Sequence, residues 1–136
     1  MFRLPATFLA LCALVSASYA LPIRENATLS KRNANDGRAT HYEVGLGACG
    51  SNDVDSESVL AISRLIYGNG EYCNQWLQIT NTANGNVKYG QMRDRCESCG
   101  QNDIDLSPSL FEALGADLNQ GVLQVEWHFM DKGWSP

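Results

Sequence analysis

The sequence predicts an all-β domain, a small closed barrel with one or two short helices. Three observations support this: period-two alternation in short segments, turn residues between them, and one well-marked helix. Residues 122–129 form the clearest strand, because apolar and polar residues alternate along it and so define one buried face. Several short strands separated by turns are typical of a closed barrel. The apolar residues of that face are Leu123, Val125, Trp127 and Phe129.

Four further strands are expected. Residues 76–81 alternate in the same way, and the Asn84-Gly85 pair that follows them is a strong hairpin signal. The returning strand is therefore expected at 86–93. Residues 38–44 and 59–63 are two shorter strand candidates.

One short helix is expected directly after Ser107, which can cap it. Pro108 suits its first turn, and Gly115 ends it. Three apolar residues fall on one face of this helix and would pack against the barrel. They are Leu110, Phe111 and Leu114.

Composition excludes several classes of function. The chain has 136 residues, which suits one domain, and 44% of them are hydrophobic, too many for a disordered chain. Its 15 acidic and 10 basic residues give a net charge of −5, so nucleic acid is not an expected partner. The glycine-rich segment Gly45–Gly50 lacks the spacing of a phosphate-binding loop and is expected to form a turn. Asp53–Asp55 is expected to be a solvated acidic loop rather than a calcium site. We expect a monomer with no cofactor and no metal site.

The N-terminal segment is expected to direct secretion. Residues 1–20 have a positive start and an apolar run of about twelve residues, too short to span a membrane, with cleavage expected after Ala20. Residues 21–32 are expected to form a short propeptide that ends in a dibasic processing site, Lys31-Arg32.

The domain would then comprise residues 33–136 and be secreted, extracellular or in the cell wall. The chain's one N-glycosylation sequon begins at Asn26, inside the expected propeptide.

Four cysteines remain after the expected processing, an even number in an oxidising compartment. This favours two disulfides over a redox motif or a zinc site, and each bridge would contribute about 2–4 kcal/mol. Spacing alone leaves all three pairings open. The cysteines are Cys49, Cys73, Cys96 and Cys99.

Five short motifs occur in an order that resembles a known family. They are GRATHY at 37–42, GACG at 47–50, DRC at 94–96, DIDLSP at 103–108 and GVLQVEW at 121–127. In this order, and with these cysteines, they resemble the double-psi β-barrel of expansin-like, RlpA-like and barwin-like proteins, in particular the single-domain secreted forms of fungi. The resemblance covers Gly37 to Phe129.

The resemblance implies a six-stranded barrel with an open polysaccharide-binding groove. It also implies pairing of Cys49 with Cys73, by analogy with barwin-like proteins, which leaves a local Cys96–Cys99 bridge. In the expansin-like family the position matching Asp105 is the essential acid. The positions matching Asp94, Thr40 and Tyr42 line the same groove.

Two carboxylates that meet in a groove can cut glycosidic bonds, one as the acid and the other as base or nucleophile. Asp105 and Asp94 are the candidates here. The residues allow another interpretation, because Asp105 precedes a helix start and could accept backbone N–H bonds that lower its pKa.

Full hydrolysis is not expected. Inverting endoglucanases of this fold carry a second Asp after a Thr-Arg-Tyr-Trp run, and the matching position here holds Val44. Glu43 lies one residue earlier and would point to the opposite face of the strand. A lytic transglycosylase route needs one acid/base residue and remains open to Asp105 alone.

Aromatic side chains bear on the same question, because sugar rings stack on flat apolar faces. Trp127 lies in register with the buried face of its strand and is expected in the core, whereas Trp134 lies in the C-terminal tail. The candidates for stacking are Tyr42, Tyr67, Tyr72, Trp76 and Trp134.

Two functions remain. The first is a secreted module that binds cell-wall polysaccharide in a groove, non-hydrolytic or weakly lytic. The second is a barwin-like interaction protein, a protease inhibitor, defence protein or effector, that binds a secreted or host protein through its loops. In the second case, replacing Asp105 would leave activity intact.

Overall fold

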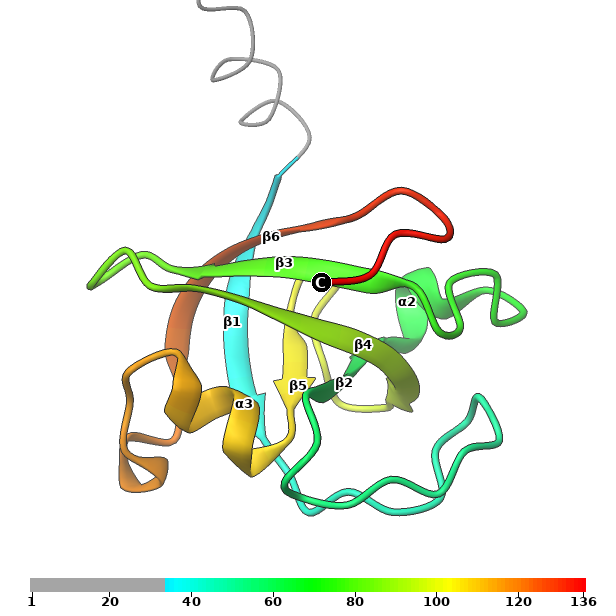
Figure 1. Ribbon diagram of the computed structural model, residues 1–136, viewed down its shortest axis with the longest axis horizontal. Helices are drawn as coiled ribbons and strands as arrows, with labels where there is room; N and C mark the ends of the chain where they lie inside the picture. Colours follow the sequence, from blue (N-terminus) through cyan, green and yellow to red (C-terminus); the bar gives the residue numbers. More distant parts are fainter. Residues whose placement is uncertain (1–33) are drawn as a thin grey trace, which may run out of the picture.

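The computed structural model describes residues 34–136, which form a closed six-stranded β-barrel (Figure 1). The predicted all-β barrel with short helices is confirmed. The expected signal peptide, propeptide, processing sites and glycosylation site lie outside the described residues. The strands are β1 (Asn35–His41), β2 (Val59–Ser63), β3 (Trp76–Asn81), β4 (Val87–Cys96), β5 (Ile104–Leu106) and β6 (Leu123–Phe129), and the helices are α2 (Arg64–Tyr67), α3 (Pro108–Ala113) and the 3₁₀ turn η1 (Leu118–Gln120).

The barrel closes in the order β1-β5-β2-β4-β3-β6. Two of its strand pairs are parallel, β1 with β5 and β2 with β4, and the other four pairs are antiparallel. Strand β5 therefore lies between β1 and β2, although it follows both in the sequence. This crossover brings residues near 40, 61, 94 and 105 into one stretch of wall.

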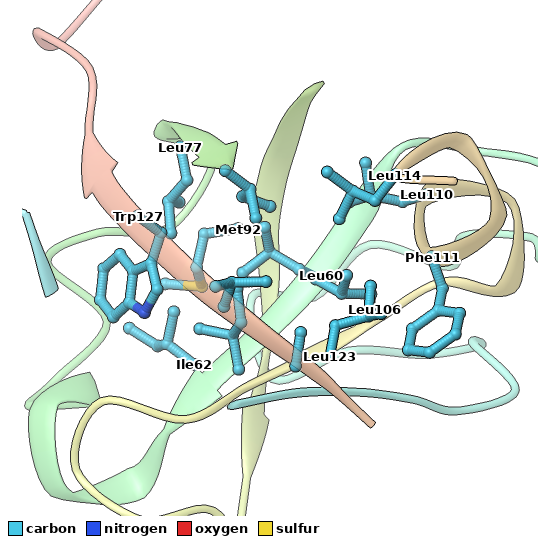
Figure 2. Close-up of a cluster of buried hydrophobic side chains, with 14 of the residues drawn as sticks. Leu60, Ile62, Leu77, Met92, Leu106, Leu110, Phe111, Leu114, Leu123 and Trp127 are labelled. Carbon is cyan, nitrogen blue, oxygen red and sulfur yellow. The ribbon is translucent and has the colours of Figure 1, made fainter. Parts of the chain in front are cut away.

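The core fills the barrel and continues beneath α3 (Figure 2). Strands β3 and β6 contribute alternate residues to it, which is why their period-two pattern could be recognised. Full burial of an aliphatic side chain is worth about 1.5–3 kcal/mol, so this cluster is the main source of stability. The largest side chains with almost no exposure include Trp127, Phe111, Leu60, Ile62, Leu77, Met92, Leu106, Leu110 and Leu114.

Trp127 joins the core to the backbone of a neighbouring turn. Its indole Nε1 donates a hydrogen bond of 2.8 Å to the carbonyl oxygen of Asn102. The same carbonyl faces Gly37 on β1, where an added Cβ would lie only 2.0 Å from that oxygen. Glycine is therefore required at 37 because β1 and the turn before β5 approach each other closely.

Several element boundaries differ from those expected. Strand β1 begins at Asn35 and ends at His41, because its first half pairs with β6 and its last residues pair with β5. Strand β4 extends to Cys96, since its second half pairs with β2. The Asn84-Gly85 hairpin joins β3 to β4 as predicted, with Gly85 at φ 78°.

Ser107 was expected to cap α3 with its side chain, and this prediction is wrong. Ser107 is the N-cap residue, but its side chain makes no capping bond to the helix. Its hydroxyl instead donates to the carbonyl oxygen of Glu57 at 2.6 Å, because Ser107 is buried against the segment before β2. The Ser107 hydrogen bond thus connects the β5–α3 junction to the loop that precedes β2.

Both disulfides join the cysteines that the resemblance implied. Cys49 is bonded to Cys73, which closes a separation of 24 residues, and Cys96 is bonded to Cys99 across a separation of three. The first bridge attaches the β1–β2 loop to the segment before β3, and the second forms a tight loop after β4. Among the helices in the described part of the chain, none has the length and apolarity to cross a membrane.

We expect Gly37→Ala to lower the free energy of unfolding by about 2–4 kcal/mol, from overpacking and loss of the Trp127 hydrogen bond. Chemical denaturation would measure the change. Gly45→Ala is the matched control, because a Cβ there meets no atom within 4 Å, and it should leave stability close to wild type. Equal stability of the two variants would contradict the role assigned to Gly37.

Candidate functional site

Four residues of neighbouring strands form a row across the outer wall of the barrel, which we call the acid row. Thr40 of β1 pairs with Asp105 of β5, Asp105 pairs with Ala61 of β2, and Ala61 pairs with Asp94 of β4. Paired residues point to the same face. Strands lie about 4.8 Å apart, so the two aspartate Cα atoms are about 10 Å apart with one alanine between them.

Strand β5 holds Asp105 in place. Its neighbours in the chain, Ile104 and Leu106, point into the core with no exposure, so Asp105 must face outward. The Thr40 hydroxyl donates a 2.8 Å hydrogen bond to its Oδ1. This side-chain partner replaces the backbone N–H bonds that the structural interpretation of Asp105 required.

The environment of Asp105 favours its protonated form. Partial burial raises the pKa of Asp105 above its ordinary value, and the nearby Asp94 carboxylate acts in the same direction. The Thr40 hydrogen bond and His41 oppose this shift without reversing it. The interpretation in which backbone bonds lower its pKa is therefore wrong.

Asp94 reaches the row through a β-bulge. The register between β2 and β4 shifts at Leu60/Ala61, so that Arg93 is the extra residue of β4 and Asp94 falls beside Ala61. The backbone N–H groups of Ala48 and Arg95 donate to Asp94 Oδ1 at 2.8 and 2.7 Å. These bonds hold the Asp94 carboxylate in one orientation.

Gly47 makes this orientation possible. A Cβ at Gly47 would lie 2.4 Å from the carbonyl oxygen of Arg93, so only glycine allows the loop to approach β4. The N–H of Cys49 donates to the same carbonyl at 3.0 Å. The glycine-rich loop, predicted as a turn, therefore positions Asp94.

Tyr42 follows β1 on the same side of the strand as Thr40, and its N–H donates to the carbonyl oxygen of Leu106 at 3.0 Å. Partial burial raises the pKa of Tyr42, and the carboxylates of Asp94, Asp105 and Asp53 raise it further. The Tyr42 hydroxyl thus stays protonated beside the acid row and can donate a hydrogen bond. The structure brings together all four predicted groove residues.

A depression of about 160 Å³ opens beside Thr40. Arg38 and Asp103 line it, and they form a salt bridge of 2.8 Å. The Arg38 hydrogen bond holds the pKa of Asp103 below its ordinary value, the opposite of Asp105 two residues later. Ser98 and Cys99 of the second disulfide loop form the opposite rim. The acid row therefore continues into a hollow at one end.

The prediction of a solvated acidic loop at 53–55 is wrong for Asp53, which is only 7% exposed. Its carboxylate lies 3.5 Å from Arg93 Nε. This ion pair offsets the cost of taking the carboxylate out of water. Asp55 is exposed, and its Oδ1 accepts from the N–H of Val44. Within residues 34–136, no group of three or more potential metal ligands is clustered.

The aromatic candidates are distributed over different parts of the barrel. Tyr67 is buried beneath the Arg95 guanidinium, and Tyr72 stacks on Phe129 with 4.3 Å between ring centroids. Trp76 on β3 and Trp134 in the C-terminal tail are partly exposed. Tyr42 alone of the aromatic candidates lies beside the acid row.

Two parts of the site were missed from sequence. Ala61 lies within a run of five buried residues, so no alternation showed that it separates the two acids. Arg38 and Asp103 carried a usable signal, since each lies two residues before a predicted groove residue and therefore on the same face of its strand.

Comparison with known proteins supports the fold. No family model matches the chain. The papain inhibitor of Streptomyces mobaraensis is 30% identical over 132 residues, which is 89% of this chain and 91% of that protein. A solved structure of a Streptomyces papain inhibitor, 30% identical to this chain, superposes with a TM-score of 0.64 over 73% of this chain and 96% of that chain.

Two longer proteins match in part. The Asp f 7 allergen homolog of Arthroderma benhamiae is 31% identical over 69% of this chain, which spans only 38% of that protein. The expansin of Clavibacter michiganensis is 26% identical, with a TM-score of 0.65 over 76% of this chain and 53% of that chain. A mutant of the same expansin is solved in complex with cellohexaose.

The chain matches the papain inhibitor over nearly its whole length, and its barrel has the same fold as the expansin. The two disulfides join the cysteines that the family resemblance implied. The chain belongs to the barwin/RlpA-like double-psi β-barrel family.

Proposed function

We propose that this protein binds a cell-wall polysaccharide along the acid row. The observation that carries the proposal is the pairing of Thr40, Asp105, Ala61 and Asp94 across four adjacent strands. The row combines a carboxyl group of raised pKa, Asp105, with a carboxylate held in one orientation, Asp94, and the small Ala61 side chain leaves space between them. Sugar hydroxyls can donate to either carboxyl group and accept from the Tyr42 hydroxyl.

The expansin complex with cellohexaose supports a glycan as the ligand, since the fold is shared. The proposal includes secretion of the chain, with its mature N-terminus at Asn33, and action on an extracellular wall.

We assign the groove a non-hydrolytic or weakly lytic action. Asp105 is suited to donate a proton to a leaving glycosidic oxygen, because its carboxyl is partly buried and its pKa is raised. Asp94 is less free to act as a base, since two backbone N–H groups already bind its Oδ1. Val44, at the expected position of a catalytic base, contributes no carboxylate. Binding and weak lytic cleavage therefore fit these residues better than efficient hydrolysis.

Asp105→Asn and Asp94→Asn are each expected to weaken retention on insoluble cellulose or chitin by about three- to tenfold, the equivalent of one lost hydrogen bond. Pull-down isotherms of the secreted domain would measure this. Asp36→Asn is the matched control, because Asp36 is exposed on β1 and lies outside the acid row. Retention of both groove variants at the wild-type level would refute the proposed binding mode.

Stability should decrease with rising pH because of Asp105. Its pKa is higher in the folded state than the unfolded value of about 3.9, so the folded protein holds a proton that the unfolded chain has lost. The free energy of unfolding therefore falls as pH rises from about 4 through the raised pKa. Asp105→Asn removes this dependence and should gain stability over wild type across that window.

Urea denaturation between about pH 3 and about pH 8 would test this expectation. The control Asp36→Asn should keep the pH slope of the wild type. A stability difference between wild type and Asp105→Asn that stays constant over this range would show that folding does not raise the pKa of Asp105.

A second function, inhibition of a cysteine protease, is favoured by one loop. Leu46 is 76% exposed and Val54 is 56% exposed, and both lie in the segment between β1 and β2. Backbone hydrogen bonds and the Cys49–Cys73 disulfide hold this segment in one conformation, which lowers the entropic cost of binding a partner. The similarity to the papain inhibitor over 91% of that protein supports a protein partner.

If the loop binds a protease, Leu46→Asp should weaken inhibition of papain at least tenfold, since it places a charge at the contact. Steady-state inhibition assays would measure the change, and Asp105→Asn should inhibit like the wild type. Absence of inhibition by the wild-type domain would exclude papain-like proteases as the partner.

A further inference from the structure

A second wall of the barrel carries aromatic side chains that the acid row does not use. On β3, Leu77 and Ile79 point into the core, so Trp76 and Gln78 point outward. On β4, Tyr89 lies opposite Gln78, which makes Trp76 and Tyr89 diagonal neighbours on the outer face. Aromatic rings on such diagonal positions are within reach of each other.

The C-terminal tail adds a third ring to this wall. The N–H of Met130 donates to the carbonyl oxygen of Trp76 at 2.8 Å, which ties the start of the tail to β3. A turn follows, in which the N–H of Trp134 donates to the backbone carbonyl oxygen of Asp131 and Gly133 has φ 86°. The Trp134 ring then lies 4.8 Å from the ring of Tyr89, tilted by 42°. Figure 1 shows the red tail folding back toward β3.

We define the aromatic patch as Trp76, Tyr89 and Trp134. All three are partly exposed, whereas Trp127, on the inner face of the barrel, is 1% exposed. The tail is therefore folded so that a large apolar side chain remains in contact with water. Clustered exposed apolar side chains commonly mark a binding surface.

Uncharged polar groups accompany the rings. Gln78 Oε1 accepts from the Tyr89 hydroxyl at 3.2 Å, and the Gln91 amide donates to the carbonyl oxygen of Asn74 at 2.8 Å. The Gln78 amide group and Gln91 Oε1 can still bond to a ligand. Neither the patch nor these two amides is ionised at neutral pH, although the chain as a whole carries a net charge of −5. Such a surface complements an uncharged ligand better than an ionic one.

We propose that the aromatic patch is a second carbohydrate-binding surface, which stacks on the pyranose faces of an uncharged polysaccharide. Sugar rings present apolar C–H faces and hydroxyl edges, which match the rings and the two amides respectively. The patch and the acid row are connected through β4, which carries both Tyr89 and Asp94. Asp94 follows Tyr89 by five positions, a span of about 17 Å, so the two surfaces lie on adjoining walls.

Trp134→Ala is expected to reduce retention on microcrystalline cellulose or chitin powder by about three- to tenfold, because stacking contacts of one ring are lost. Trp134→Phe should restore most of the retention. Leu65→Ala is the control, since it removes an exposed apolar side chain, 58% exposed, from another part of the surface. Because the ligand is uncharged, moderate salt should change none of these values.

Fluorescence gives a readout that does not depend on a variant's folding. Wild-type emission should shift on titration with cellohexaose or chitohexaose, because Trp76 and Trp134 are partly exposed while Trp127 is shielded in the core. No change with either oligosaccharide, or full retention by Trp134→Ala, would overturn the proposal. A dimer that Trp134→Ala converts to a monomer in sedimentation would assign the patch to a second copy and also overturn it.

Experiments can refute binding at the acid row and binding at the aromatic patch independently of each other. Asp94→Asn and Asp105→Asn leave the aromatic patch unchanged, so the fluorescence shift should persist in both variants. If they lose retention while Trp134→Ala keeps it, the acid row alone binds the polymer and the patch proposal is wrong. If Trp134→Ala loses retention while they keep it, the patch stands and the acid-row proposal is wrong.

Discussion

The burial of two side chains on the shortest strand is the constraint on which the acid row depends. Ile104 and Leu106 have no exposure and hold β5 between β1 and β2. Their burial is worth about 3–6 kcal/mol together, and a carboxyl between them cannot turn away without removing them from the core. The partly buried state of Asp105, and the direction of its pKa, are therefore consequences of core packing.

Much of the barrel could be predicted from sequence. Alternation reports one-sided burial directly, and β2 and β3 have the bounds that were expected. Strand β5 was not identified from its own pattern, because three residues are too few to show a period, and only the family resemblance marked that segment. The pairing of the cysteines likewise came from the resemblance, since spacing left every combination open.

The site was less accessible to sequence reasoning, because its geometry depends on pairing between strands that are distant in the chain. Ala61 separates the two acids only because β2 lies between β5 and β4. The bulge at Arg93 cannot be recognised in a strand without its partner, yet it brings Asp94 into line. The prediction that Asp53 is solvated failed for the same reason, because its ion-pair partner Arg93 lies 40 residues away in the sequence.

Strand β4 is the element that makes a small barrel suited to an extended ligand. It has ten residues, and it carries Tyr89 toward one wall and Asp94 toward the next. A single groove of this size offers few contacts, each worth about 1 kcal/mol. If both proposed surfaces bind one polymer, they do so without a flexible linker, because both are fixed on one strand, and the second contact then forms at a high effective concentration. In that binding mode a polysaccharide that bends around β4, or two chains that meet there, engages both walls at once, and modest contacts on each wall suffice for retention.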